Sequence, residues 1–280
     1  MTESTNPLQK YFRVPKIYIK LPSNGQHYPQ GAYEATPTGE IPVYSMTAKD
    51  ELLLKTPDAL LSGQSTVDVI QSCVPNIKNA WAMPSIDIDA VLIAIRQATY
   101  GNRMDFATKC PHCNEKNEHS LDLGALFSRI VSPDYKQTVR VGELEFIFKP
   151  QTFKTINQIS KETFEQQRLV NVVIDDQLSD DEKSSKFNQL FGELLNLTVA
   201  QVADSVAGIR TENGELVQNA AFIHEFFKNC EKNIWDAVKL HLDRLAESMA
   251  TKNIDLVCEN EKCKKSYTSP LIFEQSSFFV

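Results

Sequence analysis

The stretch Thr108-Lys-Cys110-Pro-His-Cys113-Asn-Glu-Lys116 places two cysteines two residues apart, and Leu256-Val-Cys258-Glu-Asn-Glu-Lys-Cys263-Lys-Lys265 places two more four residues apart. Gaps of two to four residues let a tight turn direct both sulfurs to one point, as in the knuckle of a zinc ribbon. Two such knuckles supply four thiolates, which form a closed tetrahedral site with no position for a substrate. We therefore predict one structural Zn²⁺ ion, bound by Cys110, Cys113, Cys258 and Cys263.

The sequence alone leaves other uses of these cysteines open. They could form two unrelated pairs, disulfides in an oxidising compartment, or the ligands of an iron–sulfur cluster. His112 lies between two of them and could replace a sulfur ligand. Six cysteines in 280 residues are too few for the disulfide scaffold of a small secreted domain, and thiols in a reducing compartment more readily bind metal. Cys73 and Cys230 have apolar neighbours, which indicates buried structural thiols.

Lysines flank both cysteine pairs, at Lys109, Lys116, Lys262, Lys264 and Lys265. A zinc ion with four thiolates carries a net negative charge, and nearby cations offset that charge. The lysines are therefore consistent with a zinc site.

The composition is that of an ordinary globular protein, with 42% hydrophobic and 23% charged residues. A net charge of −7 argues against general attraction to nucleic acid or anionic membranes, because both require a positive field. No apolar run approaches the roughly 20 residues of a membrane-spanning helix, and Met1 to Leu8 lacks the pattern of a signal peptide. We expect no membrane association and a cytoplasmic location.

The hydrophobic pattern predicts an α+β fold that begins with an N-terminal α/β lobe at residues 14–109, after a flexible segment at 1–13. Apolar and polar residues alternate over 14–21, and 40–46 supplies a second strand. Thr47 with Asp50 resembles a helix cap. The clearest helix spans 86–99, where apolar residues recur every three or four positions.

A second, mainly helical lobe is expected at residues 131–253. It begins with a β-hairpin over 138–148 and continues with an amphipathic helix over 153–169. Ser179 with Glu182 predicts a capping box for another helix through Leu195. Residues 212–215 predict a small hairpin turn, and two further helices span 222–230 and 234–249. The zinc knuckle region, 110–130 with 254–270, is expected to join the lobes, and residues 271–280 form an apolar C-terminal tail.

The sequence lacks the short motifs of common enzymes. It has no glycine-rich phosphate loop, no HExxH pair, no Gly-x-Ser-x-Gly elbow and no kinase motif set. Its five histidines are scattered along the chain. We therefore expect a non-enzymatic protein with no small-molecule substrate.

The N-terminal half contains an ordered series of short motifs. They are Tyr18-Ile-Lys-Leu-Pro-Ser-Asn-Gly25 with Tyr28, Met46-Thr-Ala-Lys-Asp-Glu51, Leu54-Lys-Thr-Pro-Asp-Ala-Leu60, Val69-Ile-Gln-Ser-Cys-Val-Pro75, Ala94-Ile-Arg-Gln-Ala-Thr-Tyr-Gly101, Cys110-Pro-His-Cys113 and Leu121-Asp-Leu123. In order and spacing, this series resembles the baseplate hub assembly family of contractile-tailed bacteriophages of the T-even type. The resemblance covers residues 14–126 and the second cysteine pair.

The resemblance implies a protein that helps to build the central hub of a phage tail baseplate, as a structural component or an assembly chaperone. Its partners would be baseplate hub and tail proteins, and its location the host cytoplasm during assembly or the virion tail. Aromatic residues and arginine are the usual anchors of protein interfaces. We hypothesise that Tyr28, Arg96 and Tyr100 lie near the partner surface, or alternatively that they serve the fold.

Two other classes of protein use similar cysteine motifs. The alternative function is a zinc-ribbon nucleic-acid-binding protein, against which the net acidity and the lack of a basic stripe with stacking aromatics count. A thiol–disulfide enzyme using Cys110 and Cys113 would require a helix that begins at the first cysteine. The residues after Cys113 instead predict a polar turn.

Overall fold

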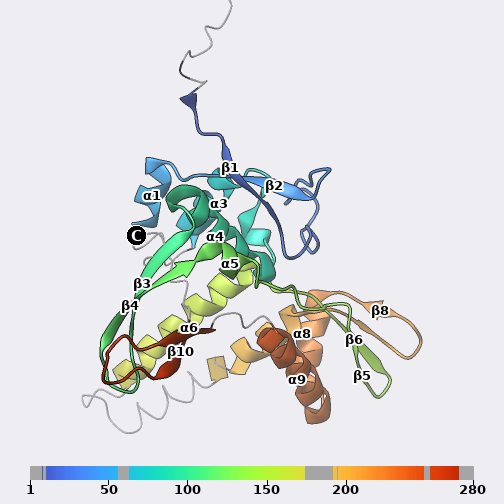
Figure 1. Ribbon diagram of the computed structural model, residues 1–280. Coiled ribbons are helices and arrows are strands. Elements are labelled where there is room, and N and C mark those ends of the chain that lie inside the picture. Colours follow the sequence, from blue (N-terminus) through green and yellow to red (C-terminus); the bar gives the residue numbers. More distant parts are fainter. Residues whose placement is uncertain are drawn as a thin grey trace, which may run out of the picture. The chain divides into compact units, whose positions relative to one another are not determined.

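The computed structural model divides the chain into two compact units (Figure 1). Unit 1 comprises residues 1–80, 87–130 and 252–280, and unit 2 comprises 81–86 and 131–251. The structure describes residues 8, 11–55, 63–173, 192–193, 195–248 and 253–270. The expected apolar tail at 271–280 and most of the expected flexible segment at 1–13 lie outside this described part.

Unit 1 begins with a two-stranded antiparallel sheet, as the alternating pattern predicts. Strand β1 (Pro15–Lys20) pairs with β2 (Glu40–Tyr44), and Ile19 and Ile41 are buried on its inner side. The expected cap at Thr47 is confirmed. Its hydroxyl accepts from the amide of Asp50 at the start of α1 (Ala48–Leu54), and the carboxylate of Asp50 accepts from the amide of Thr47.

The guanidinium of Arg13 attaches the segment before β1 to the rest of unit 1. It donates to the carbonyl oxygens of Ser45 and Ser72, each at 2.7 Å, and lies 3.4 Å from the carboxylate of Asp50. Ser72 lies in α3 (Gln64–Cys73). One long cationic side chain thus attaches the end of the segment 1–13 to carbonyls from two distant parts of the chain.

Helix α4 (Ser85–Tyr100) supplies much of the core of unit 1. Its bounds confirm the predicted helix, but the sequence pattern indicated one apolar face. The residues Ala90, Val91, Ile93, Ala94 and Ile95 are all fully buried. A helix that is apolar on all sides is a core helix, and the fold surrounds this one.

Two β-hairpins complete unit 1. Strand β3 (Arg103–Lys109) pairs along its whole length with β4 (Lys116–Asp122), which leads into α5 (Leu123–Phe127). Strand β9 (Asn253–Val257) pairs with β10 (Ser266–Pro270). Figure 1 shows β10 beside the far end of the β3–β4 hairpin, although the two hairpins are distant in the sequence.

Besides its helices, unit 2 contains a four-stranded antiparallel sheet in the order β5-β6-β7-β8. The expected hairpin is confirmed as β5 (Val139–Val141) and β6 (Leu144–Phe148). Strands β7 (Val206–Arg210) and β8 (Leu216–Val217) extend it. The hairpin turn predicted at residues 212–215 is confirmed as the turn between β7 and β8.

The described helices of unit 2 follow the predicted order, and the helix predicted over 179–195 lies almost wholly outside the described residues. They are α6 (Phe153–Val173), α8 (Ala220–Asn229) and α9 (Lys232–Ser248), and residues 195–204 are also helical. Phe146 and Phe148 of β6 pack with Ile223 and Phe227 of α8 and with Val238 of α9. These contacts form one apolar core for the unit.

Residues 81–86 belong with unit 2, although the sequence analysis includes them in the N-terminal lobe. The short 3₁₀ helix η2 (Ala80–Ala82) brings the Trp81 ring to 5.4 Å from that of Phe153. The amide of Phe153 donates to Met83, and the amide of Ser85 donates to Gln151. Aromatic packing and backbone hydrogen bonds therefore attach this segment to the start of α6.

A buried carboxylate, Asp87 of α4, connects this helix to the loop after β1. It accepts the amide of Ser23 at 2.8 Å, the hydroxyl of Ser23 at 2.5 Å and the hydroxyl of Tyr28 at 2.9 Å. Burial raises the pKa of Asp87, and the hydrogen bonds from Ser23 and Tyr28 only partly oppose this rise.

We predict that Asp87→Ala lowers the free energy of unfolding by about 2–4 kcal/mol, because buried donors lose their acceptor. In the wild type, the raised native pKa of Asp87 means that the native state binds more protons than the unfolded state above a pH of about 4. Asp87→Asn has no carboxyl at this position and is the reference for the pH dependence. The stability of the wild type relative to Asp87→Asn should therefore fall as pH rises through the native pKa. Urea unfolding from pH 4 to 8 measures this difference, and a difference independent of pH would contradict the prediction.

Candidate metal centre

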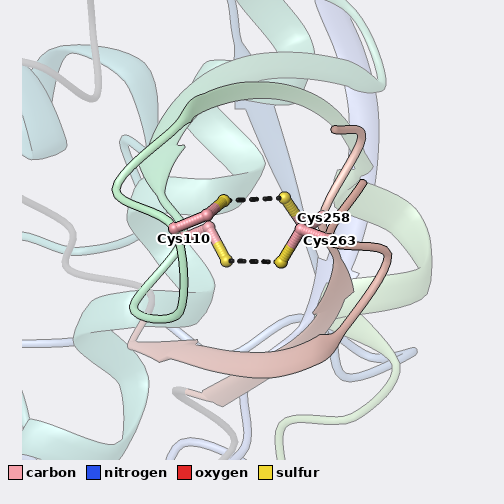
Figure 2. Close-up of side chains that lie close together, drawn as sticks. Cys110, Cys258 and Cys263 are labelled. Carbon is pink, nitrogen blue, oxygen red and sulfur yellow. Dashed lines mark hydrogen bonds between the residues drawn. The ribbon is translucent and has the colours of Figure 1, made fainter. Parts of the chain in front are cut away.

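The tips of the two hairpins of unit 1 carry the predicted cysteines. Cys110 and Cys113 lie in the turn between β3 and β4, and Cys258 and Cys263 lie in the turn between β9 and β10. Figure 2 shows the sulfurs of one turn facing those of the other. The structure therefore brings together residues separated by more than half of the chain.

The spacing of the sulfurs fits a single ion. The Sγ atom of Cys113 lies 3.6 Å from that of Cys258, and Cys110 Sγ lies 3.9 Å from Cys263 Sγ. All four lie within 4.8 Å of one another. A tetrahedron with Zn–S bonds of about 2.3 Å has S–S edges of about 3.8 Å. The thiols thus have the separation of a tetrahedral ligand set, and none of them forms a disulfide.

In both turns, the residue after the second cysteine has a left-handed backbone conformation. Asn114 has φ +59° and Lys264 has φ +43°, so both residues are left-handed. The amide of Asn114 donates to the carbonyl of Cys110, and that of Lys264 donates to Asn260. This reversal turns the chain into β4 and β10 and leaves the cysteines of each pair on the same side. Asparagine tolerates such a conformation better than most residues do.

Amide groups of the first turn favour a thiolate at Cys110. Burial alone would raise its pKa, but hydrogen bonds from the amides of His112 and Cys113 and from neighbouring thiols outweigh burial and lower the pKa of Cys110 to about 7. At Cys113 the amide of Glu115 favours ionisation, but burial and the other thiols raise the pKa to about 12. Burial also raises the pKa of Cys258. The surroundings of the cluster therefore favour ionisation of Cys110 and oppose that of Cys113 and Cys258.

Contacts outside the cysteines also join the two hairpins. The side chain of Asn117, 1% exposed, accepts the amide of Glu259 at 2.7 Å and donates to the carbonyl of Glu115. The hydroxyl of Tyr267 lies 2.6 Å from that of Thr108 and 3.0 Å from Nε2 of His119. Sequence reasoning missed these residues, because a buried asparagine in an alternating strand has the same pattern as an exposed one.

The structure bears on the alternatives left open by the sequence. The thiol–disulfide enzyme requires a helix at the first cysteine, whereas Cys110 opens a turn followed by β4. His112 is exposed, and its Nε2 lies 3.4 Å from the carbonyl of Ser266. The flanking lysines, Lys109, Lys116, Lys262, Lys264 and Lys265, are all exposed on the hairpin ends.

The three residues predicted for a partner surface lie in different surroundings. The hydroxyl of Tyr28 donates to buried Asp87, and its ring stacks on Tyr33 at 5.0 Å. Arg96 is 8% exposed, with its guanidinium 5.3 Å from the centre of the Tyr100 ring. Tyr100, at the end of α4, is 44% exposed. The structure thus brings Arg96 and Tyr100 together, and only Tyr100 presents a large exposed surface.

The fold and this site define a protein in which two hairpins, distant in the sequence, meet at a cluster of four thiols that could bind a metal ion. The model of the family described as T4 bacteriophage base plate protein matches residues 14–280, nearly the whole chain. The chain belongs to this family, which implies a structural protein of the phage baseplate and interactions with other baseplate proteins. No curated protein and no solved structure matches the chain. Among the described helices, none has the length and apolarity to cross a membrane.

We predict that Asn114→Val destabilises the first turn by about 1–2 kcal/mol, because a β-branched residue is strained at positive φ. Asn114→Gly is the control, since glycine adopts this conformation freely and should leave stability nearly unchanged. Thermal unfolding of both variants measures the effect. Equal stability of the two variants would show that the left-handed turn is not required.

Proposed function

We propose that this protein is a non-enzymatic component or assembly chaperone of the phage baseplate hub, held in shape by one structural zinc ion. The observation that carries the proposal is the cluster of four cysteines from two hairpin tips, in a chain that belongs to a baseplate family. The hub role extends the family assignment, and the resemblance of residues 14–126 to hub assembly proteins supports it. The protein would act in the host cytoplasm during assembly and in the virion tail if it stays there.

The residues of the cluster suit zinc by chemistry as well as by distance. Thiolates are soft ligands, and four of them with tetrahedral spacing favour zinc or iron. Cys110 and Cys258 are buried, and the sulfurs leave no position for a substrate. Cys110, Cys113, Cys258 and Cys263 would therefore hold the ion in a closed site, and the ion would lock the two hairpins in place. Its role is architectural and leaves binding to the protein surface.

The zinc prediction is tested by metal analysis of Cys258→Ser. We expect about one zinc per chain in the wild type and a large loss in the variant, because three thiolates bind zinc much more weakly than four. Cys230→Ser is the matched control, since Cys230 lies in unit 2 outside the cluster. Metal-free wild-type protein whose stability does not change on chelation would overturn the proposal. Iron that co-purifies with the protein would assign the four cysteines to an iron–sulfur centre instead of a zinc site.

The hub role is tested through Tyr100, which we propose as the residue that contacts the partner. The guanidinium of Arg96 packs against its ring. A tyrosine anchor contributes about 2 kcal/mol or more to an interface. We expect Tyr100→Ala to reduce recovery of tail-hub proteins severalfold when the protein is purified from infected cells. Its melting temperature should change little, because the ring is partly exposed.

Phe222→Ala is the control for this experiment, because Phe222 is an aromatic residue of unit 2 that is 60% exposed. It should leave recovery unchanged. A lower melting temperature with intact hub binding in Tyr100→Ala would assign Tyr100 to the fold. Recovery of only replication or transcription proteins by the wild type would overturn the hub proposal.

A further inference from the structure

Strand β1 has one paired edge and one open edge within the described residues. Its register with β2 sets Tyr18 opposite Pro42. Proline has no N–H group, so this pair must be one that exchanges no backbone hydrogen bonds. The N–H and C=O of Tyr18 therefore point away from β2, and by alternation those of Lys20 do too. Among the described residues, no other backbone group bonds to this edge.

The outward face of β1 carries a basic and aromatic pattern. Lys16, Tyr18 and Lys20 are all exposed, and the side chain of Tyr18 is 62% exposed. Neither lysine forms an ion pair with a described residue. Phe12 and Val14, just before the strand, are also exposed. On the β2 side, Lys20 lies directly opposite the exposed Glu40, and the register shifts between Pro15 and Ile17, next to Lys16. The two lysines are therefore the cationic groups that β1 itself presents, on a chain with a net charge of −7.

The strand is held rigidly on its other side, so its outward face is a preformed surface. Ile19 is buried beneath it, and Arg13 attaches the preceding segment through the carbonyls of Ser45 and Ser72. A partner that adds to this edge therefore need not order β1 itself. A preformed strand lowers the entropic cost of pairing.

The lysines determine what can pair with the strand. A second copy that paired antiparallel about Tyr18 would set Lys16 opposite Lys20 twice, and an in-register parallel copy would set each lysine opposite itself. Like charges directly opposite one another destabilise a β-pair, and edge lysines are a common protection against self-association. Opposite charges at the same positions stabilise it.

We infer that the open edge of β1 binds an extended segment of another protein by strand addition. Opposite Lys16 and Lys20 this segment carries acidic residues four positions apart, with an apolar residue midway that contacts the ring of Tyr18. The partner is therefore an acidic strand, not a second copy of this chain. The surface shares no residue with the cysteine cluster or with Tyr100, so it adds an interface that the proposed function does not contain.

The test uses the full-length protein and a synthetic peptide with two glutamates four residues apart, valine midway and threonine elsewhere. We expect the peptide to shift the amide resonances of β1, above all Tyr18 and Lys20. In Lys16→Glu/Lys20→Glu the peptide should bind about tenfold more weakly, while a peptide with lysines in place of the glutamates should bind this variant better than the wild type. Both lysines are exposed, but Lys20 lies directly opposite Glu40 of β2, so the amide spectrum of the variant must show that β1 and β2 stay paired. Lys16→Glu alone is the second variant, and it should weaken binding of the acidic peptide in the same direction.

A second control separates strand addition from simple charge attraction. The same acidic peptide with methylated backbone nitrogens keeps its charge but cannot donate hydrogen bonds, and it should lose binding. Equal binding of the methylated peptide, equal binding to wild type and charge-reversed variant, absence of binding, or resonance shifts away from β1 would overturn the inference. Concentration-dependent self-association that the charge reversal abolishes would assign the edge to a second copy instead. None of these outcomes affects the zinc or hub proposals, which depend on other residues.

Discussion

The meeting of two hairpin turns in unit 1 is the constraint on which the rest of the structure depends. One turn follows β3 in the middle of the chain, and the other follows β9 near its end. Between them the chain forms most of unit 2, so the segment 131–251 leaves unit 1 and must return to it. The entropic cost of closing a loop grows only slowly with length, by about 0.6 kcal/mol for each doubling. A few strong contacts at the hairpin tips can therefore offset the entropic cost of closing the long segment between them.

Those contacts have two kinds of chemistry. The thiols differ in their tendency to ionise, because the surroundings lower the pKa of Cys110 and raise that of Cys113. Asn117 and Tyr267 join the same hairpins through neutral hydrogen bonds that need no ion. The neutral contacts set the relative position of the turns, and a metal would add strength to a geometry already close to tetrahedral. The structural role that we propose for this site agrees with membership of a baseplate family.

The sequence predicted the elements whose signal is local. The alternation over β1, the cap at Thr47 and the hairpin of β5 and β6 depend on neighbours within a few residues, and the structure has them close to the expected bounds. The turn between β7 and β8 was predicted, but the place of β7 beside β6 and the burial of α4 on all sides were not. The first depends on pairing with β6, and the second depends on how many other elements surround the helix. Neither property is present in a short window of sequence.

By itself, the sequence identified the four cysteines that the structure brings together. Cysteine spacing restricts each pair to one turn, and the reach of a tight turn is a local property. Only the tertiary structure decided that the two turns meet, that Asn117 is buried between them, and that Tyr28 and Arg96 face the interior of unit 1 while Tyr100 stays partly exposed. Those facts depend on contacts between residues far apart in the chain. Burial and charge at such contacts are set by the packing of the whole unit and by no single segment.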